Sequence, residues 1–261
     1  NLVSIGERAF YGCCSLESFV APNVEYAGKE AFYGCAALQT LTLPPMARLF
    51  ELFGDNGETA EFDKIEFENL FYGVPKALKT VYLSDKADKL IDYAFYNCKS
   101  MEKAVLPYGI TEIGASAFEE CHSLQRVVNI DGVSVINAFA FAHCLSLKSA
   151  HDTQDIFVLP ASIKEIGDYA FINCQSITDF VVEWGSQIRR IGDYAFADMV
   201  NTEYDIPDME NPLSVGEGAF LNNKKLTAFN AANVVEIGDG AFSGCLALEK
   251  ITLCADGFSG K

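Results

Sequence analysis

Apolar and polar residues follow one pattern that returns every 22 to 25 residues along the chain. Each copy begins with an Ile-Gly-x-x-Ala-Phe-x-x-Cys segment, as in residues 5–13, 166–174 and 237–245. Six residues after most of these phenylalanines a second pattern begins, in which apolar and polar residues alternate, as in residues 38–43. Alternation is typical of a short strand with one buried face. The apolar spacing of the first segment is about one helical turn, so it predicts a helical turn there.

The phenylalanine of this pattern recurs through almost the whole chain, with two longer gaps. A fixed period of this length is the signature of a repeat architecture. We therefore predict one domain over residues 1–261, made of about ten repeats of 22–25 residues. The repeat phenylalanines, of which Phe71 marks a degenerate copy, are Phe10, Phe32, Phe71, Phe95, Phe118, Phe141, Phe171, Phe196, Phe220 and Phe242.

Each repeat is then one strand and one helical turn, and a single repeat cannot bury its own apolar face. Stacking solves this, because successive strands add side by side at about 4.8 Å into a parallel sheet with the helical turns packed behind it. Pro44, Pro107 and Pro160 follow strands directly, where the ladder of hydrogen bonds must end. The pattern predicts an α/β solenoid.

Two insertions interrupt the repeats. The larger, at about residues 45–68, holds Phe50, Leu52 and Phe53. It is either a functional loop or a distorted repeat in which these apolar side chains cover the core. The smaller insertion, at about 150–157, splits the strand half of the sixth repeat.

The combined pattern, Leu-x-x-Leu-x-Leu-Pro followed by Ile-Gly-x-x-Ala-Phe-x-x-Cys, resembles the leucine-rich repeats of the BspA-like family. The resemblance implies a right-handed superhelix with one parallel sheet on its concave face and short helical turns on its convex face. Members are commonly bacterial or protist surface or secreted proteins, and many are adhesins or presumed adhesins. An extracellular or cell-surface location is therefore implied.

The cysteines are mostly repeat positions. Seven of the nine lie three residues after the repeat phenylalanine, while Cys14 and Cys254 lie elsewhere. Equivalent positions of stacked repeats point into the core in register, where a thiol is a small apolar filler. We expect buried, reduced thiols at Cys13, Cys35, Cys98, Cys121, Cys144, Cys174 and Cys245.

The chain offers little that indicates catalysis. His122 and His143 each adjoin a repeat cysteine, but they lack a second histidine at metal-ligand spacing. We expect no enzyme, no metal site and no cofactor. The net charge of −17 disfavours nucleic acid as a partner, and no apolar run of 18 residues predicts membrane insertion.

The exposed face of the predicted sheet is the one surface for which geometry makes a case. Its middle carries basic residues and its later part acidic ones, which an oppositely charged protein surface could match. Tyr82 and Trp184 are candidate aromatic anchors. The alternative is a sheet face that is merely solvated. The candidate ligand face consists of Thr80, Tyr82, Lys103, Arg126, Asp179, Trp184, Glu203 and Asp205.

The resemblance and this face together predict a non-enzymatic cell-surface or secreted recognition and adhesion module that binds a protein ligand through the concave sheet. Two other hypotheses remain: a structural spacer within a longer surface protein, and a carbohydrate-binding protein. The repeats begin at Ile5 and close at Leu253 without an evident polar cap. We therefore also expect end-to-end self-association or further flanking sequence.

Overall fold

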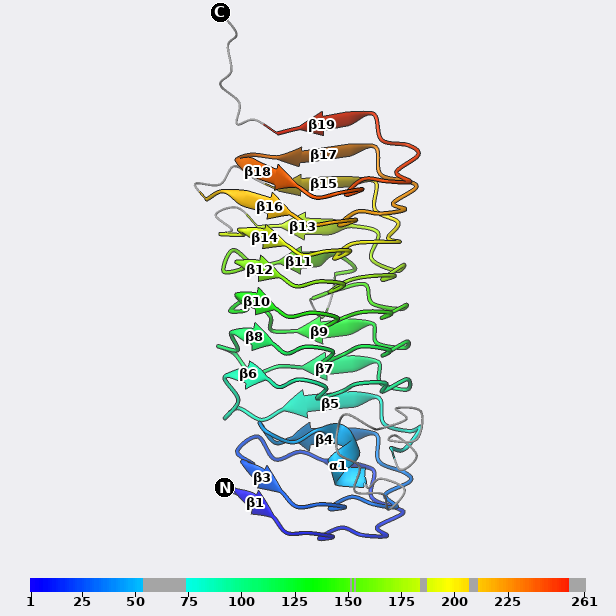
Figure 1. Cartoon of the computed structure of the whole chain (residues 1–261). Coiled ribbons are helices and arrows are strands. Elements are labelled where there is room, and N and C mark those ends of the chain that lie inside the picture. The colour runs from blue at the N-terminus through cyan, green and yellow to red at the C-terminus, as the bar shows by residue number, and fades with distance from the viewer. Residues whose placement is uncertain (54–73, 151, 153, 184–186, 207–210, 254–261) are drawn as a thin grey trace, which may run out of the picture.

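The chain forms a column of stacked turns in a computed structural model (Figure 1). The structure describes residues 1–53, 74–150, 152, 154–183, 187–206 and 211–253. Two rows of short strands run up the column. In each row most strands pair in parallel with the equivalent strand of the next turn. The molecule is therefore a parallel-strand β-solenoid.

The front row is formed by the alternating segments that follow the repeat phenylalanines. It divides into a five-stranded, a two-stranded and a three-stranded sheet, with orders β2-β4-β5-β7-β9, β11-β13 and β15-β17-β19. Its strands are β2 (Ser18–Phe19), β4 (Thr40–Leu43), β5 (Thr80–Leu83), β7 (Lys103–Val105), β9 (Arg126–Val128), β11 (Phe157–Leu159), β13 (Phe180–Val182), β15 (Glu203–Ile206), β17 (Ala228–Ala231) and β19 (Lys250–Thr252).

The second row is formed by the residues around the Ile-Gly dipeptides. It divides into the pair β1-β3 and a seven-stranded sheet from β18 to β6. Its strands are β1 (Ser4–Ile5), β3 (Tyr26–Ala27), β6 (Lys89–Leu90), β8 (Glu112–Ile113), β10 (Val135–Ile136), β12 (Glu165–Ile166), β14 (Arg190–Ile191), β16 (Leu213–Val215) and β18 (Val234–Ile237).

The predicted single parallel sheet is thus wrong in two respects. A second row of strands exists, and the front row is interrupted between β9 and β11 and again between β13 and β15. The smaller insertion enters at the first interruption, where Ser149 keeps one isolated parallel bridge to Arg126 before the chain leaves the row. The handedness of the superhelix, its concave face and the number of repeats stay predictions.

The predicted helical turns are also wrong. Residues two before and two after the repeat phenylalanine adopt left-handed backbone conformations, as at Tyr169 (φ 58°) and Asn173 (φ 60°). A continuous right-handed helix cannot contain them. Instead, the amide of Phe171 donates to the carbonyl of Ala195 in the following turn at 2.8 Å. Backbone groups at this corner therefore bond between turns.

Within the described residues, the only α-helix is α1 (Leu49–Phe53), which lies in the larger insertion. Leu52 and Phe53 are fully buried, and the Leu52 carbonyl accepts the Phe32 amide at 2.9 Å. The packing interpretation is confirmed for these two side chains. The Phe50 side chain and Phe71, the predicted repeat centre, lie outside what the structure describes.

The core is a stack of aromatic rings along the column axis. The Phe141 ring lies between those of Phe118 and Phe171, at centroid distances of 5.2 and 5.1 Å with nearly parallel planes. Each such pair contributes about 0.5–1.5 kcal/mol beyond burial. The turns pack so closely that a Cβ on Gly167 would lie 2.5 Å from the Ala138 nitrogen, so this position requires glycine.

Candidate functional site

The front face, defined as the outward side chains of the front row, follows the predicted alternation on most strands. On β15 the side chains of Glu203 and Asp205 are exposed, while Tyr204 and Ile206 point into the core. Thr42 and Val128 depart from the expectation and are buried. The Thr42 hydroxyl is used internally, because it accepts the amide of Ala21 at 3.0 Å.

The structure places most of the candidate ligand residues on this face, in two groups. Thr80 and Tyr82 on β5, Lys103 on β7 and Arg126 on β9 are half-buried. Asp179, immediately before β13, is exposed. Glu203 and Asp205 lie higher on the column, on β15. Trp184 lies outside the described residues.

The two basic candidates are occupied by the chain itself. Lys103 forms an ion pair with Asp152. Arg126 pairs with Asp155 at 2.5 Å, and it donates a further hydrogen bond to the Gln154 carbonyl at 2.9 Å. All three partners belong to the smaller insertion. Residues of this insertion therefore contact β7 and β9, which the repeat pattern could not predict.

The acidic candidates have no such internal partner. Among the described residues, no basic side chain forms an ion pair with Asp179, Glu203 or Asp205. Glu203 accepts a hydrogen bond from the Asn230 side chain at 3.0 Å, and the Thr178 hydroxyl donates to Asp179 at 3.1 Å. Val181, 44% exposed, lies beside Asp179 on the same face. This half of the face is acidic with an apolar centre.

The cysteine positions form a ladder that sequence reasoning recognised only as filler. The thiol of Cys144 donates to the Phe118 carbonyl, and that of Cys174 to the Phe141 carbonyl, both at 3.0 Å. Burial raises the pKa of both thiols, because it penalises the thiolate. Asn223 makes the same bond through its side-chain nitrogen, to the Phe196 carbonyl at 2.8 Å. A cysteine or an asparagine can thus make this bond, whereas the buried Met199 fills the equivalent position in the Phe196 repeat without donating.

The expectation of buried thiols holds for most of the ladder. Cys35, Cys98, Cys121, Cys144 and Cys174 are buried, and Cys245 is half-buried. Cys13 is exposed, contrary to the expectation, because no described turn packs beneath the first one. Cys14 is exposed as expected, and Cys254 lies outside the described residues.

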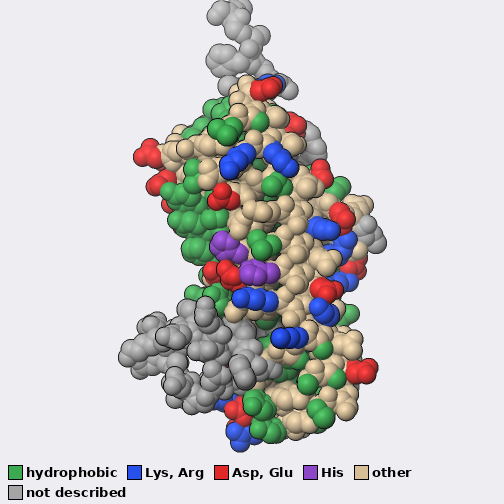
Figure 2. All heavy atoms as spheres, turned by 90° about the vertical axis from the view of Figure 1, so that its right-hand side faces the viewer, with side chains coloured by type: hydrophobic (Ala, Val, Ile, Leu, Met, Phe, Trp, Pro, Cys, Tyr) green, Lys and Arg blue, Asp and Glu red, His purple; other side chains and the backbone are tan. Residues whose placement is uncertain are grey.

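The histidines contact polar neighbours rather than thiols. His122 lies 2.7 Å from Glu120, and the His143 ring lies 3.2 Å from the Asn173 side-chain nitrogen. Figure 2 shows histidine side chains close together among scattered acidic and basic groups. In the part of the chain that the structure describes, no group of three histidine, cysteine or acidic side chains could hold a metal ion. No described helix is long and apolar enough to span a membrane.

Comparison with protein families gives one match that covers most of the chain. The profile of the BspA type leucine rich repeat region matches six copies, within residues 1–51, 62–156 and 150–258. No curated protein matches the sequence.

Two of the following solved structures share the fold. A leucine-rich repeat protein from Bacteroides ovatus is 22% identical with a TM-score of 0.57, and the match covers 97% of this chain and 64% of that one. The T. pallidum leucine rich repeat protein is 27% identical with a TM-score of 0.52, over 65% of this chain and 77% of that one. A leucine rich cell surface protein from Faecalibacterium prausnitzii is 23% identical with a TM-score of 0.46, over 100% of this chain and 70% of that one.

Proposed function

The chain belongs to the BspA-type leucine-rich repeat family, and from this premise we propose that it is a non-enzymatic recognition module of a cell-surface or secreted protein. Its ligand is a protein, bound on the front face. The observation that carries this proposal is the unequal use of charge on that face, where the basic residues are paired within the chain and the acidic ones are not.

The half of the front face whose charged residues have no ion-pair partner among the described residues, here called the open half, determines the chemistry of the ligand. The half that contains Lys103 and Arg126 is called the occupied half. Asp179, Glu203 and Asp205 are exposed on the same face as the apolar side chain of Val181, which is also exposed. A cationic protein surface with a small apolar contact complements such a patch. Lys103 and Arg126 contribute less, because a ligand carboxylate would first have to displace Asp152 and Asp155. The candidate anchor Tyr82 lies on the occupied half.

Charge reversal on the open half tests the proposal. The variant Asp179→Lys, Glu203→Lys, Asp205→Lys is compared with the wild type in pull-downs from extracellular-matrix and neighbouring-cell surface proteins. A matched control, Glu7→Lys, Glu165→Lys, Glu236→Lys, makes the same change in net charge at exposed positions off the front face. We expect at least one partner that the wild type and the control retain and the front-face variant loses.

Two further measurements complete the test: the salt dependence of partner retention and the thermal unfolding of the three proteins. Retention should fall as salt rises from 50 to 300 mM, because exposed charges are screened. Circular dichroism melting of all three proteins shows whether the substitutions leave the fold intact. Equal recovery of every partner by the folded front-face variant and the control would refute the front-face site and favour the spacer role.

A further inference from the structure

The second row of strands is broken at one level of the column. β3 is the upper edge of the pair β1-β3, and β6 is the lower edge of the seven-stranded sheet. In the described part of the turn between them, residues 28–53 and 74–88, the structure has α1 and no second-row strand. Figure 1 shows the break between β3 and β6. On its lower side β6 therefore pairs with no described strand, although it lies inside the column rather than at its end.

The hydrogen-bonding groups on this edge can be named. Leu90 faces β8, because its carbonyl accepts the Gly114 amide at 2.8 Å. Alternate residues of a parallel strand bond to opposite neighbours, so the Lys89 carbonyl and the Ile91 amide face the other way. No described residue bonds to either group. In the turns above, the equivalent amides of Gly114, Asn137 and Gly167 each bond to the turn below.

A pocket of about 190 Å³ lies along this edge. Leu90 and Ile91 line it from above, and Met46, 67% exposed, and Arg48 line it from the α1 side. Unsatisfied backbone groups of a strand beside a pocket form a template for one more strand.

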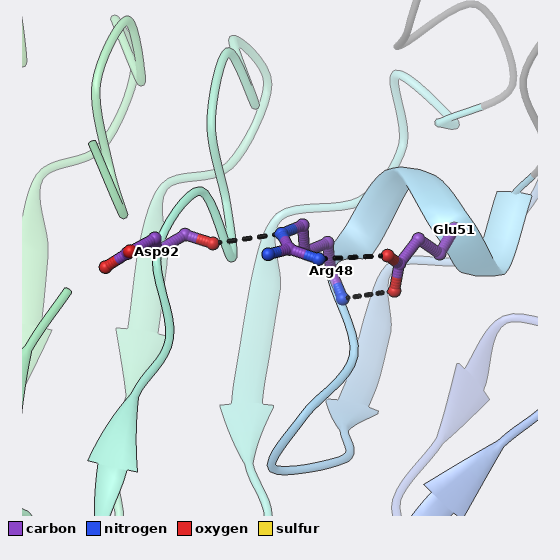
Figure 3. A network of polar contacts seen from close by, with 3 residues as sticks. All are labelled: Arg48, Glu51 and Asp92. Carbon is purple, nitrogen blue, oxygen red and sulfur yellow. Dashed lines mark hydrogen bonds and ion pairs between the residues drawn. The ribbon is translucent and has the colours of Figure 1, made fainter. Parts of the chain in front are cut away.

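Polar contacts hold the α1 side of the pocket in place (Figure 3). The Arg48 guanidinium donates to the Asp92 carbonyl at 3.1 Å and to Glu51 at 3.2 Å, and the Arg48 amide donates to Glu51 at 3.0 Å. These bonds tie the start of α1 to the turn that follows β6. The wall is therefore fixed beside the strand edge.

We propose that this pocket binds an extended peptide segment of another protein, which adds as a parallel strand to the free edge of β6. One peptide residue supplies an amide to the Lys89 carbonyl and a carbonyl to the Ile91 amide. The side chain of Ile91 does not prevent this pairing, because Asn137 at the equivalent position still bonds to Ile113 at 3.0 Å. The pocket carries both Lys89 and Asp92, so backbone pairing dominates recognition over charge.

The chain supplies its own probe. Residues 110–115, Ile-Thr-Glu-Ile-Gly-Ala, contain β8, which pairs with β10 from below, so a capped peptide of this sequence is a suitable probe. It is titrated into the ¹⁵N-labelled full chain, and amide shifts are followed by NMR. We expect saturable shifts at Ile91 and its neighbours. The matched control carries an N-methyl group on the peptide residue equivalent to Ile113, which removes the amide that Lys89 would accept.

The N-methyl peptide should bind at least tenfold more weakly than the parent. Met46→Trp, which fills the pocket from an exposed position, should weaken the parent peptide similarly, and Met46→Ala should not. Equal binding of both peptides, no shift at Ile91 up to millimolar peptide, or shifts confined to the end strands β1, β2, β18 and β19 would overturn the proposal. Because the front face takes no part, these outcomes do not bear on the proposed function.

Discussion

The regular turns from β8 to β14 and the turn that contains α1 both fill the core of the column, but they differ in how their backbone bonds to the neighbouring turns. In the regular turns each backbone and thiol group at the repeat corner is used by a neighbour, as where Cys174 donates to the Phe141 carbonyl. In the α1 turn the core is still filled by Leu52 and Phe53, but the described residues of this turn form no second-row strand. The regular repeat thus uses these groups internally, whereas the interruption at α1 leaves the Lys89 carbonyl and the Ile91 amide without a bond to any described residue.

On the front face the smaller insertion does the opposite of the α1 turn, because it supplies partners to groups that would otherwise be exposed. There the inserted residues Asp152 and Asp155 occupy Lys103 and Arg126 rather than leaving them open. Exposed ion pairs of this kind contribute only about 0–1 kcal/mol each. These ion pairs therefore determine which charges the front face exposes, and they contribute little to the free energy of unfolding.

The largest effect is expected at the second-row glycines, where a regular turn is compared with the first turn, beneath which no described turn packs. Gly167→Ala would place a Cβ 2.5 Å from the Ala138 nitrogen, so a turn must shift, at a cost of about 1–3 kcal/mol. Gly6→Ala has nothing within 4 Å and should change the free energy of unfolding by less than about 0.5 kcal/mol. Urea denaturation measures both. Similar losses would contradict the close packing assigned to regular turns.

A smaller contrast is expected among the thiols. Cys13 and Cys14 are exposed and should react with iodoacetamide within minutes at pH 8. Cys144 and Cys174 should remain unlabelled until the protein is unfolded, because they are buried and burial raises their pKa, which keeps the thiolate scarce. Peptide mapping by mass spectrometry assigns each label. Fast labelling of the two buried thiols in the native protein would show that the ladder opens readily.

The sequence predicted the repeat, the solenoid and most inward positions, because burial imposes a period that a single chain reveals. The prediction of a helical turn around each repeat phenylalanine was wrong, because apolar spacing alone does not distinguish a helix from a turn whose backbone bonds to neighbouring turns. A signal was present in Gly12 and Asn173, residue types that tolerate the left-handed conformation they adopt. Tyr169 adopts the same conformation without any such signal.

The candidate face was predicted less completely than the fold. Alternation placed Glu203 and Asp205 outward correctly. It failed at Thr42, whose hydroxyl satisfies a buried amide. It also could not show that Asp152 and Asp155 reach Lys103 and Arg126, because repeat spacing says nothing about the path of an insertion.

The central claim is that the interruption of the second row at α1 leaves backbone groups of β6 open that the regular turns satisfy. Residue-resolved hydrogen exchange of the free protein tests it most directly, by comparing the amide of Ile91 with that of Gly114, its equivalent one turn above. We predict that Gly114, bonded to the Leu90 carbonyl, exchanges at least tenfold more slowly than Ile91, relative to their intrinsic rates. Equal protection of the two amides would show that the edge of β6 is already covered and would contradict the account.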